Sequence, residues 1–210
     1  MAEIAIIEYG VGNIQSVANA IRRLGYNPHI VSDGDHLFEK QYSHIVLPGV
    51  GAMGHALLKL NERGLSQALD QCVIQKGIPF LGICVGMQVM AETCEEFGEF
   101  KGLGWIPGRV RHMSLLGSKM CLPHVGWNTN ENVSTSSKFI EISGKDAYFL
   151  HSCAYECDDE YVLAKAHYGI SFPSMVGYDH ICGVQFHPEK SSTIGEAVFR
   201  AFLATSPNGG

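Results

Sequence analysis

Short apolar runs alternate with segments of helical periodicity along the first half of the chain, and this alternation constrains the fold more than any other feature. The apolar runs cover residues 3–9, 44–47 and 78–83. The helical segments, residues 14–24 and 65–73, repeat apolar side chains three or four positions apart. Because strands that alternate with helices pair in parallel, we predict a parallel sheet covered by helices.

The pattern changes after Gly98. Short stretches separated by turn residues carry no long helical periodicity, which predicts an antiparallel addition to the sheet. These stretches are residues 104–112, 119–128, 147–155, 161–168 and 175–185. A last helix is predicted over residues 193–204. We therefore expect an α/β fold with a mostly parallel central sheet flanked by helices and an antiparallel extension in the second half, with residues 1–210 forming a single domain.

Composition excludes several classes of function. The formal net charge of −6 offers no basic surface for nucleic acid or an anionic membrane. The apolar runs are too short to span a bilayer, and the N-terminus lacks a basic signal-peptide region, so we expect a cytoplasmic protein without nucleic-acid or membrane partners. The 7 cysteines have no repeating spacing, and only Cys153 and Cys157 form a close pair. We therefore expect reduced thiols, no metal and no cofactor.

Cys84 stands where an apolar strand runs into the start of a helix. Gly82 and Gly86 flank it symmetrically, as a tight turn with little room for Cβ atoms requires. A side chain on such a strand-to-helix elbow projects out of the sheet, and the first N–H groups of the helix favour its thiolate. Although most free cysteines are small core residues, this setting predicts that Cys84 is a nucleophile.

A second apolar strand, residues 181–186, runs into His187, Pro188 and Glu189. Residues two apart on an extended chain face the same way, so the imidazole and the carboxylate can approach one site. A carboxylate that accepts the imidazole N–H orients the ring and stabilises the imidazolium formed when the ring takes a proton from a thiol. With Cys84, these residues complete a set of nucleophile, base and orienting group.

The glycine-rich segment 49–54 matches the G-x-G-x-x-G pattern of dinucleotide-binding loops. It follows a later strand than that motif requires, however, and Asp70, at the separation of a ribose-binding acid, lies inside a predicted helix. The segment can instead offer a backbone N–H at Gly51 or Val50 to a tetrahedral oxyanion, opposite the N–H of Val85. A plain turn is the alternative.

The Cys84 elbow, residues 48–51 and the motif from His187 to Glu189, in this order, resemble the class I (triad) glutamine amidotransferases. Within that class, further segments look like the glutaminase subunits of imidazole glycerol phosphate synthases. These segments are residues 9–13, 49–52, 102–104, 123–128 and 185–191. The resemblance spans nearly the whole chain.

The resemblance implies hydrolysis of glutamine to glutamate and ammonia through a thioester on Cys84. His187 would carry the proton to the leaving ammonia, and Gln88, one helical turn after Cys84, is well placed for the substrate's amino-acid end. The residues that the resemblance places against glutamine are Gln88, Glu96, His151 and Ser152. Relatives usually carry larger or aromatic side chains at Cys153 and Met53, so the pocket wall is expected to differ in detail.

The resemblance also implies a heterodimer with a (β/α)8 synthase subunit. That partner would use the ammonia to form imidazole glycerol phosphate and aminoimidazole carboxamide ribotide in histidine biosynthesis. The residues expected to face it are Asn13, Trp127, Tyr148 and Lys190. The alternatives are a paralogous subunit that serves an amino-sugar or amidino-sugar synthase, a non-catalytic scaffold module and, from the triad alone, a cysteine peptidase.

Overall fold

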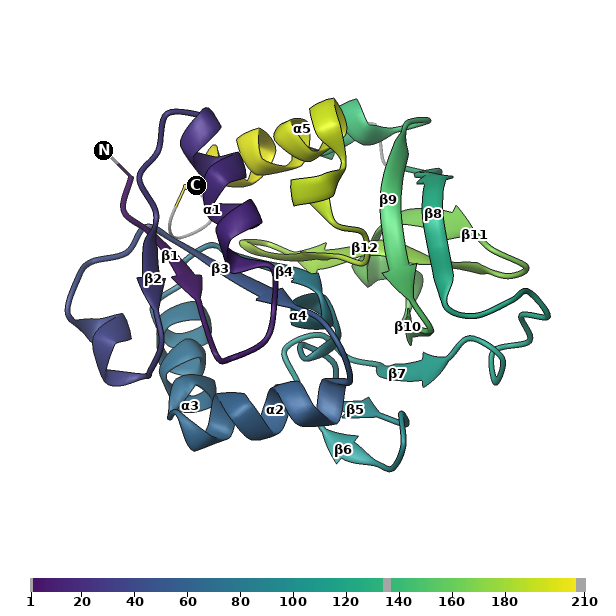
Figure 1. Ribbon diagram of the computed structural model, residues 1–210, viewed down its shortest axis with the longest axis horizontal. Coiled ribbons are helices and arrows are strands. Elements are labelled where there is room, and N and C mark those ends of the chain that lie inside the picture. The colour runs from purple at the N-terminus through teal and green to yellow at the C-terminus, as the bar shows by residue number, and fades with distance from the viewer. Residues whose placement is uncertain (1, 134–136, 207–210) are drawn as a thin grey trace.

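A seven-stranded sheet runs through the centre of the computed structural model, which describes residues 2–133 and 137–206 (Figure 1). The strand order is β11-β12-β13-β4-β3-β1-β2. Its parallel strands are β2 (His29–Val31), β1 (Ile4–Ile7), β3 (His44–Gly49), β4 (Phe80–Cys84) and β13 (Ile181–Val184). Its antiparallel strands are β12 (Ser171–Tyr178) and β11 (Val162–His167). Strands β1, β3, β4 and β13 are fully buried, as parallel strands covered on both faces should be.

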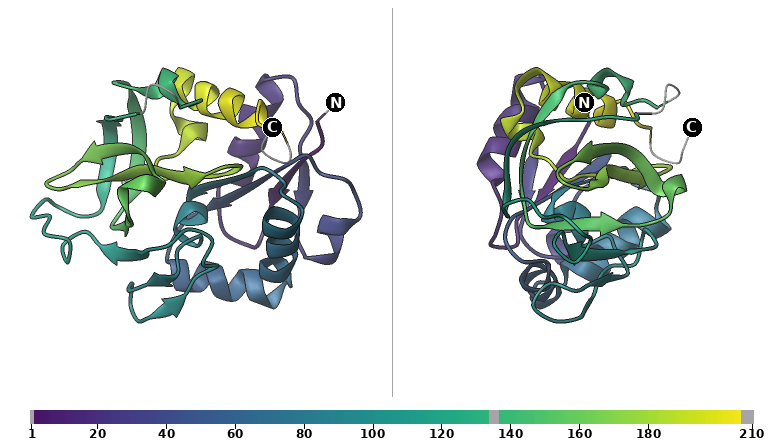
Figure 2. Two further views of the ribbon diagram at one scale, coloured as in Figure 1. Left: turned by 180° about the vertical axis from the view of Figure 1, so that it is seen from behind. Right: turned by 90° about the vertical axis from the view of Figure 1, so that its right-hand side faces the viewer.

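Helices cover both faces of this sheet. Helices α1 (Ile14–Arg23) and α5 (Ser192–Leu203) lie on one side, and α2 (Met53–Glu62) and α3 (Leu65–Asp70) lie on the other (Figures 1 and 2). Helix α3 continues into a π-helical turn, Gln71–Gln75. The short helix α4 (Val85–Gln88) follows β4 directly. In residues 2–133 and 137–206, no helix is long and apolar enough to cross a membrane.

The remaining strands lie beside the central sheet. A four-stranded sheet has the order β10-β7-β5-β6. Its members are β10 (Cys153–Glu156), β7 (Arg109–His112), β5 (Thr93–Cys94) and β6 (Phe100–Lys101). Strands β8 (His124–Thr129) and β9 (Asp146–His151) form a separate antiparallel pair. The α/β class and the antiparallel second half are therefore confirmed, but part of that half builds small sheets of its own.

The structure differs from the sequence analysis in two local features. Residues 175–185 were expected in the antiparallel addition, but β13 pairs antiparallel only with β12 and in parallel with β4. Strand β2 and helix α2 were not predicted, and α2 begins inside the glycine-rich segment that masked its periodicity.

Candidate active site

The Cys84 elbow is a strained turn held by close backbone packing. Cys84 adopts φ 55° and ψ −109°, a region that costs a non-glycine residue about 1–3 kcal/mol and persists only when its surroundings impose it. A Cβ atom at Gly86 would lie 1.8 Å from the Leu47 carbonyl oxygen, and one at Gly82 would lie 2.4 Å from the Gly86 carbonyl oxygen. The two glycines thus let β3, β4 and α4 approach closely enough to fix the turn.

The parallel pairing of β13 with β4 brings the second motif to the same edge. Gly183 pairs with Gly82 and Val184 with Ile83, so the chain that leaves β13 passes beside Cys84. The His187 ring and the Glu189 carboxylate form a hydrogen-bonded ion pair, with 2.9 Å between Nδ1 and Oε1 and side chains only 2% and 1% exposed. Glu189 lies in a 3₁₀ turn, Pro188–Lys190, and not on extended chain as the two-residue spacing assumed.

The electrostatics of His187 suit a base. Burial by itself would lower the pKa of the ring, because the charged form loses water. The interaction with Cys84, followed by the hydrogen bond and charge of Glu189, outweighs burial and raises the pKa of His187 to about 10. Among the described residues, Nε2 has no hydrogen-bond partner of ordinary geometry, while Nδ1 is held by Glu189. Nε2 is therefore the ring nitrogen left available for a further hydrogen bond, and His187 lines the same cavity as Cys84.

A cavity of about 80 Å³ joins Cys84 and His187 to the residues predicted to bind substrate and oxyanion. Its lining includes Val50, Gly51, Val85, Gln88, Glu96, His151 and Ser152. Glu189 does not line it and stands behind His187. Predicted site residues that lie more than a hundred positions apart in the sequence therefore line one cavity. Leu150 and Cys153 also line it.

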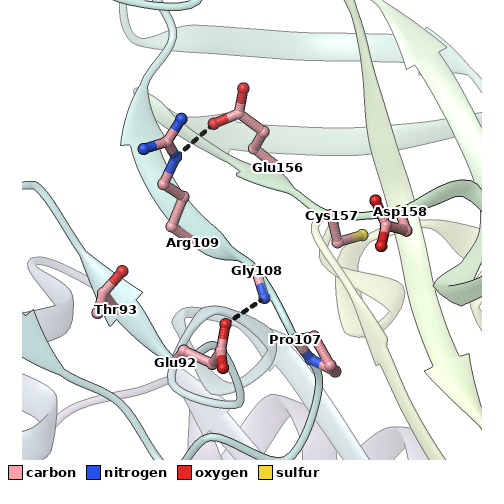
Figure 3. A pocket seen from close by; sticks show the side chains of 8 residues that line it. All are labelled: Glu92, Thr93, Pro107, Gly108, Arg109, Glu156, Cys157 and Asp158. Atoms are coloured by element: carbon pink, nitrogen blue, oxygen red, sulfur yellow. Dashed lines mark hydrogen bonds and ion pairs between the residues drawn. The ribbon is translucent and has the colours of Figure 1, made fainter.

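A larger depression of about 640 Å³ lies along the four-stranded sheet, away from the triad, and is lined by Thr93 of β5, Arg109 of β7 and Glu156 of β10 (Figure 3). Two of its carboxylates already accept hydrogen bonds from within its lining. Arg109 donates to Glu156 across 2.6 Å, and Glu92 accepts the Gly108 N–H across 3.0 Å. None of the triad residues lines this depression, whereas Cys84 and His187 line the smaller cavity.

The two sides of the predicted oxyanion site differ in how they are held. Val85 begins α4, where the first backbone N–H groups of a helix lack intrahelical partners. Gly51 has φ +83°, and a Cβ there would meet no atom within 4 Å. Val50 is 38% exposed. The Val85 side is therefore closely packed, whereas Val50 is partly exposed and an added Cβ at Gly51 would meet open space.

Of the two residues expected to alter the pocket wall, Cys153 lines the cavity and Met53 does not. The backbone N–H of Met53 donates to the Glu96 carboxylate across 3.2 Å. Burial, followed by the charge and hydrogen bond of Glu96, raises the pKa of the Cys153 thiol, so this thiol stays neutral. The Met53 N–H thus holds the Glu96 carboxylate where Glu96 lines the cavity.

Gln185 is a site residue to which the sequence analysis assigned no role. Its side-chain Nε2 lies 3.7 Å from Cys84 Sγ, and its Oε1 accepts a hydrogen bond of 3.1 Å from Gln88 Nε2. A signal for it existed, because Gln185 stands two residues before His187 on the same apolar run.

The residues predicted to face a partner gather at the rim near His187. Trp127 and Tyr148 are opposite each other on β8 and β9, with ring centroids 6.1 Å apart. The Lys190 ammonium lies 5.4 Å from the Tyr148 centroid, and the Tyr148 ring lies 6.5 Å from that of His187. Asn13 precedes α1, which packs against the turn that carries Lys190.

Comparison with known proteins identifies the family of this chain. The family model for glutamine amidotransferase class-I matches residues 5–205, so the chain belongs to that family. A relative from Bdellovibrio bacteriovorus named "Imidazole glycerol phosphate synthase subunit HisH" is 43% identical, over 95% of this chain and 98% of its own. A relative from Vibrio vulnificus, "Imidazole glycerol phosphate synthase subunit HisH 2", is 42% identical over 96% of this chain and 94% of its own.

Solved structures agree in fold. A glutamine amidotransferase aligns with a TM-score of 0.72 at 19% identity and covers 95% of this chain and 96% of its own. A glutamine amidotransferase from Thermotoga maritima aligns with a TM-score of 0.63 at 19% identity, over 96% of this chain and 82% of its own. These likenesses extend the shared fold to proteins of low sequence identity.

Proposed function

We propose that this chain is the glutaminase subunit of an imidazole glycerol phosphate synthase, which hydrolyses glutamine to glutamate and supplies ammonia to a synthase partner. One observation carries the proposal: a buried His187–Glu189 pair stands beside a strained Cys84 elbow. The chain in which this occurs belongs to the class-I glutamine amidotransferases and is 43% identical to a relative with that subunit name.

The proposed mechanism uses the triad in two half-reactions. Cys84 Sγ attacks the side-chain amide carbon of glutamine, while His187 accepts the thiol proton and delivers it to the amide nitrogen as the C–N bond breaks. Ammonia leaves and a thioester remains. His187 then takes a proton from water, which attacks the thioester, and glutamate leaves as the thiol regains its proton. Glu189 keeps the ring oriented throughout, and its charge stabilises the imidazolium.

The surrounding wall supports binding of the substrate. The N–H of Val85 and the segment with Val50 and Gly51 lie on the cavity, suited to the oxyanion that forms when sulfur attacks. The Glu96 carboxylate has the charge that the ammonium group of glutamine requires. Gln88, His151 and Ser152 complete the wall around the amino-acid end.

An apolar face beside the cavity supports a synthase partner. The β8–β9 pair exposes Val125, Trp127 and Leu150, which are 54%, 57% and 37% exposed. Such a patch on a monomer marks an interaction site. We propose that a (β/α)8 subunit covers this face, with Asn13, Tyr148 and Lys190 at its edge, and receives ammonia close to where His187 releases it.

Substitution of the nucleophile tests the proposal. In the complex with the synthase partner and that partner's ligand, Cys84→Ala should abolish glutamate release from glutamine, while synthesis from added ammonium salts continues. The exposed Cys121 offers a matched control, and Cys121→Ala should keep both activities. Glutamate release that survives Cys84→Ala would reject the mechanism. Co-purification from the host, with the bound barrel protein identified by mass spectrometry, separates the histidine pathway from the sugar alternative.

A further inference from the structure

We propose that Gln185 is a positioning residue for the nucleophile, whose side-chain amide donates a hydrogen bond to Cys84 Sγ and favours the sulfur in its anionic form. The inference rests on the proposed function, because it concerns the reactivity of that same thiol. It begins from the 3.7 Å contact between Nε2 and Sγ and from the complete burial of Gln185.

The backbone places Gln185 firmly beside the sulfur. Gln185 directly follows β13, whose parallel pairing with β4 aligns the ends of the two strands. Its own N–H donates to the Ser174 carbonyl on β12 across 2.9 Å, which ties the residue to the antiparallel side of the sheet. A buried amide side chain in such a position needs partners for both its oxygen and its nitrogen.

A backbone carbonyl decides which way the amide points. The Cys153 carbonyl can only accept, so the Gln88 side chain must direct its Nε2 toward it, and the two lie 3.3 Å apart. The second hydrogen of that Nε2 is then available for Gln185 Oε1, 3.1 Å away. With its oxygen facing Gln88, Gln185 must direct its own N–H groups toward the sulfur.

The surroundings of the sulfur show what this donor does. In the thiol form, Cys84 can donate to the Leu150 carbonyl oxygen across 3.8 Å. Once the proton has moved to His187 Nε2, the sulfur faces the partial negative charge of that carbonyl, and the contact becomes repulsive. The contact with Gln185 N–H changes in the opposite sense, because hydrogen bonds strengthen when the acceptor is ionised. Gln185 therefore stabilises the charged sulfur before attack and when the thioester breaks.

This role also alters how Gln88 contributes. The Gln88 Nε2 group is occupied by Cys153 and Gln185, and the residue is only 3% exposed. Gln88 thus acts on the reaction in part through Gln185. Gln185 itself is absent from the residues that line the cavity, so its loss should lower kcat and leave KM nearly unchanged.

Two substitutions separate this role from simple packing. Gln185→Glu keeps an oxygen for Gln88 and nearly the same shape, but it replaces the donor with a negative charge. Gln185→Met removes both donor and acceptor while retaining the side-chain volume. It provides the same test if Gln185→Glu does not fold. Cys182→Ala is the matched control, because Cys182 is similarly buried three residues earlier and its thiol contacts the Phe80 carbonyl instead.

The measurements are kcat and KM for glutamine in the complex, and the pH dependence of Cys84 alkylation by iodoacetamide, followed by mass spectrometry of its peptide. Loss of a hydrogen bond to a charged group predicts a drop in kcat of about 10- to 100-fold for both Gln185 variants. We expect KM within about 3-fold of wild type and an alkylation midpoint moved to higher pH, most in Gln185→Glu. Cys182→Ala should keep the wild-type midpoint.

Distinct outcomes overturn the inference and the proposed function. Folded Gln185 variants with wild-type kcat, or with an unchanged alkylation midpoint, would reject Gln185 as a positioning residue while glutaminase activity stands. A kcat loss matched by Cys182→Ala would reject it too, by pointing to packing alone. No glutamate release by the wild-type complex, or release that persists in Cys84→Ala, would instead reject the proposed function.

Discussion

The two walls of the catalytic cavity are built in different ways. The wall from the first half, the Cys84 elbow, is held by backbone against backbone, with glycines where no Cβ fits. The wall from the second half, at β9, is held by a buried histidine pair. His124 Nδ1 lies 3.0 Å from His151 Nε2, and His151 Nδ1 lies 2.9 Å from the Cys153 carbonyl.

Hydrogen bonding dictates the protonation of that pair. Because the Cys153 carbonyl only accepts, His151 must donate through Nδ1, and its Nε2 must accept from His124. The His124 ring stacks on Tyr168 and Phe149, with centroids 4.0 and 5.1 Å away. Burial lowers the pKa of His124 to about 4 and, as the main cause, that of His151 to about 3. Added side-chain atoms should therefore destabilise the first wall, and protonation of His124 or His151 should destabilise the second.

The largest expected effect lies on the elbow. Gly86→Ala would place a Cβ against the Leu47 carbonyl, a contact that only a backbone shift can relieve. We expect a loss of about 3 kcal/mol or more in the free energy of unfolding, or no soluble protein. Thermal and denaturant unfolding measure this. A Gly86→Ala protein with wild-type stability would show that the elbow is not held by crowding.

The second effect concerns the histidine pair in mild acid. Between pH 6.5 and about 4 the unfolded chain binds more protons than the folded one, because both folded pKa values lie below the ordinary value of 6.5. Their contribution to stability is therefore complete above pH 6.5 and declines as the pH falls. His124→Asn keeps a donor near the Nδ1 position but cannot titrate there. The variant should be less stable at pH 7.5, yet lose less free energy of unfolding than wild type between pH 7 and 5.

If the free energy of unfolding changes equally with pH in His124→Asn and in wild type, the histidine pair does not make stability pH-dependent. Chemical denaturation at several pH values measures these changes, and carboxylates that titrate in the same range cancel in the difference between the two proteins.

The smallest expected effect comes from Gly51→Ala, which strains a backbone φ angle without creating a steric clash. Gly51→Ala meets no neighbour but strains a φ of +83°, so stability should fall by about 1 kcal/mol, while glutaminase kcat falls about 10-fold. Gly25→Ala is the matched control, because φ there is +90° with equally open space at the end of α1. It should show a similar stability change and wild-type activity, measured by thermal unfolding and glutamate release. Equal activity losses in both variants would remove Gly51 from the oxyanion site.

Local patterns predicted a large share of the fold and the candidate site. Helical spacing located α1 and α5, and apolar runs located β1, β3 and β4. The glycines around Cys84 predicted the elbow, since a sharp turn leaves a steric signature in the residues that form it. Helix α2 escaped because its start lies in a glycine-rich segment that reads equally well as a loop.

By itself, the sequence predicted Cys84 as the candidate nucleophile and determined the pairing of His187 with Glu189 and the alternation of strands and helices, because each depends on residues close together along the chain. Only the tertiary structure decided that β13 lies parallel to β4, and hence that Gln185 lies beside Cys84. It likewise decided the contact between His124 and His151. Such contacts depend on the register of strands far apart in the chain, which minimises buried unpaired polar groups over the whole molecule and leaves no local pattern to read.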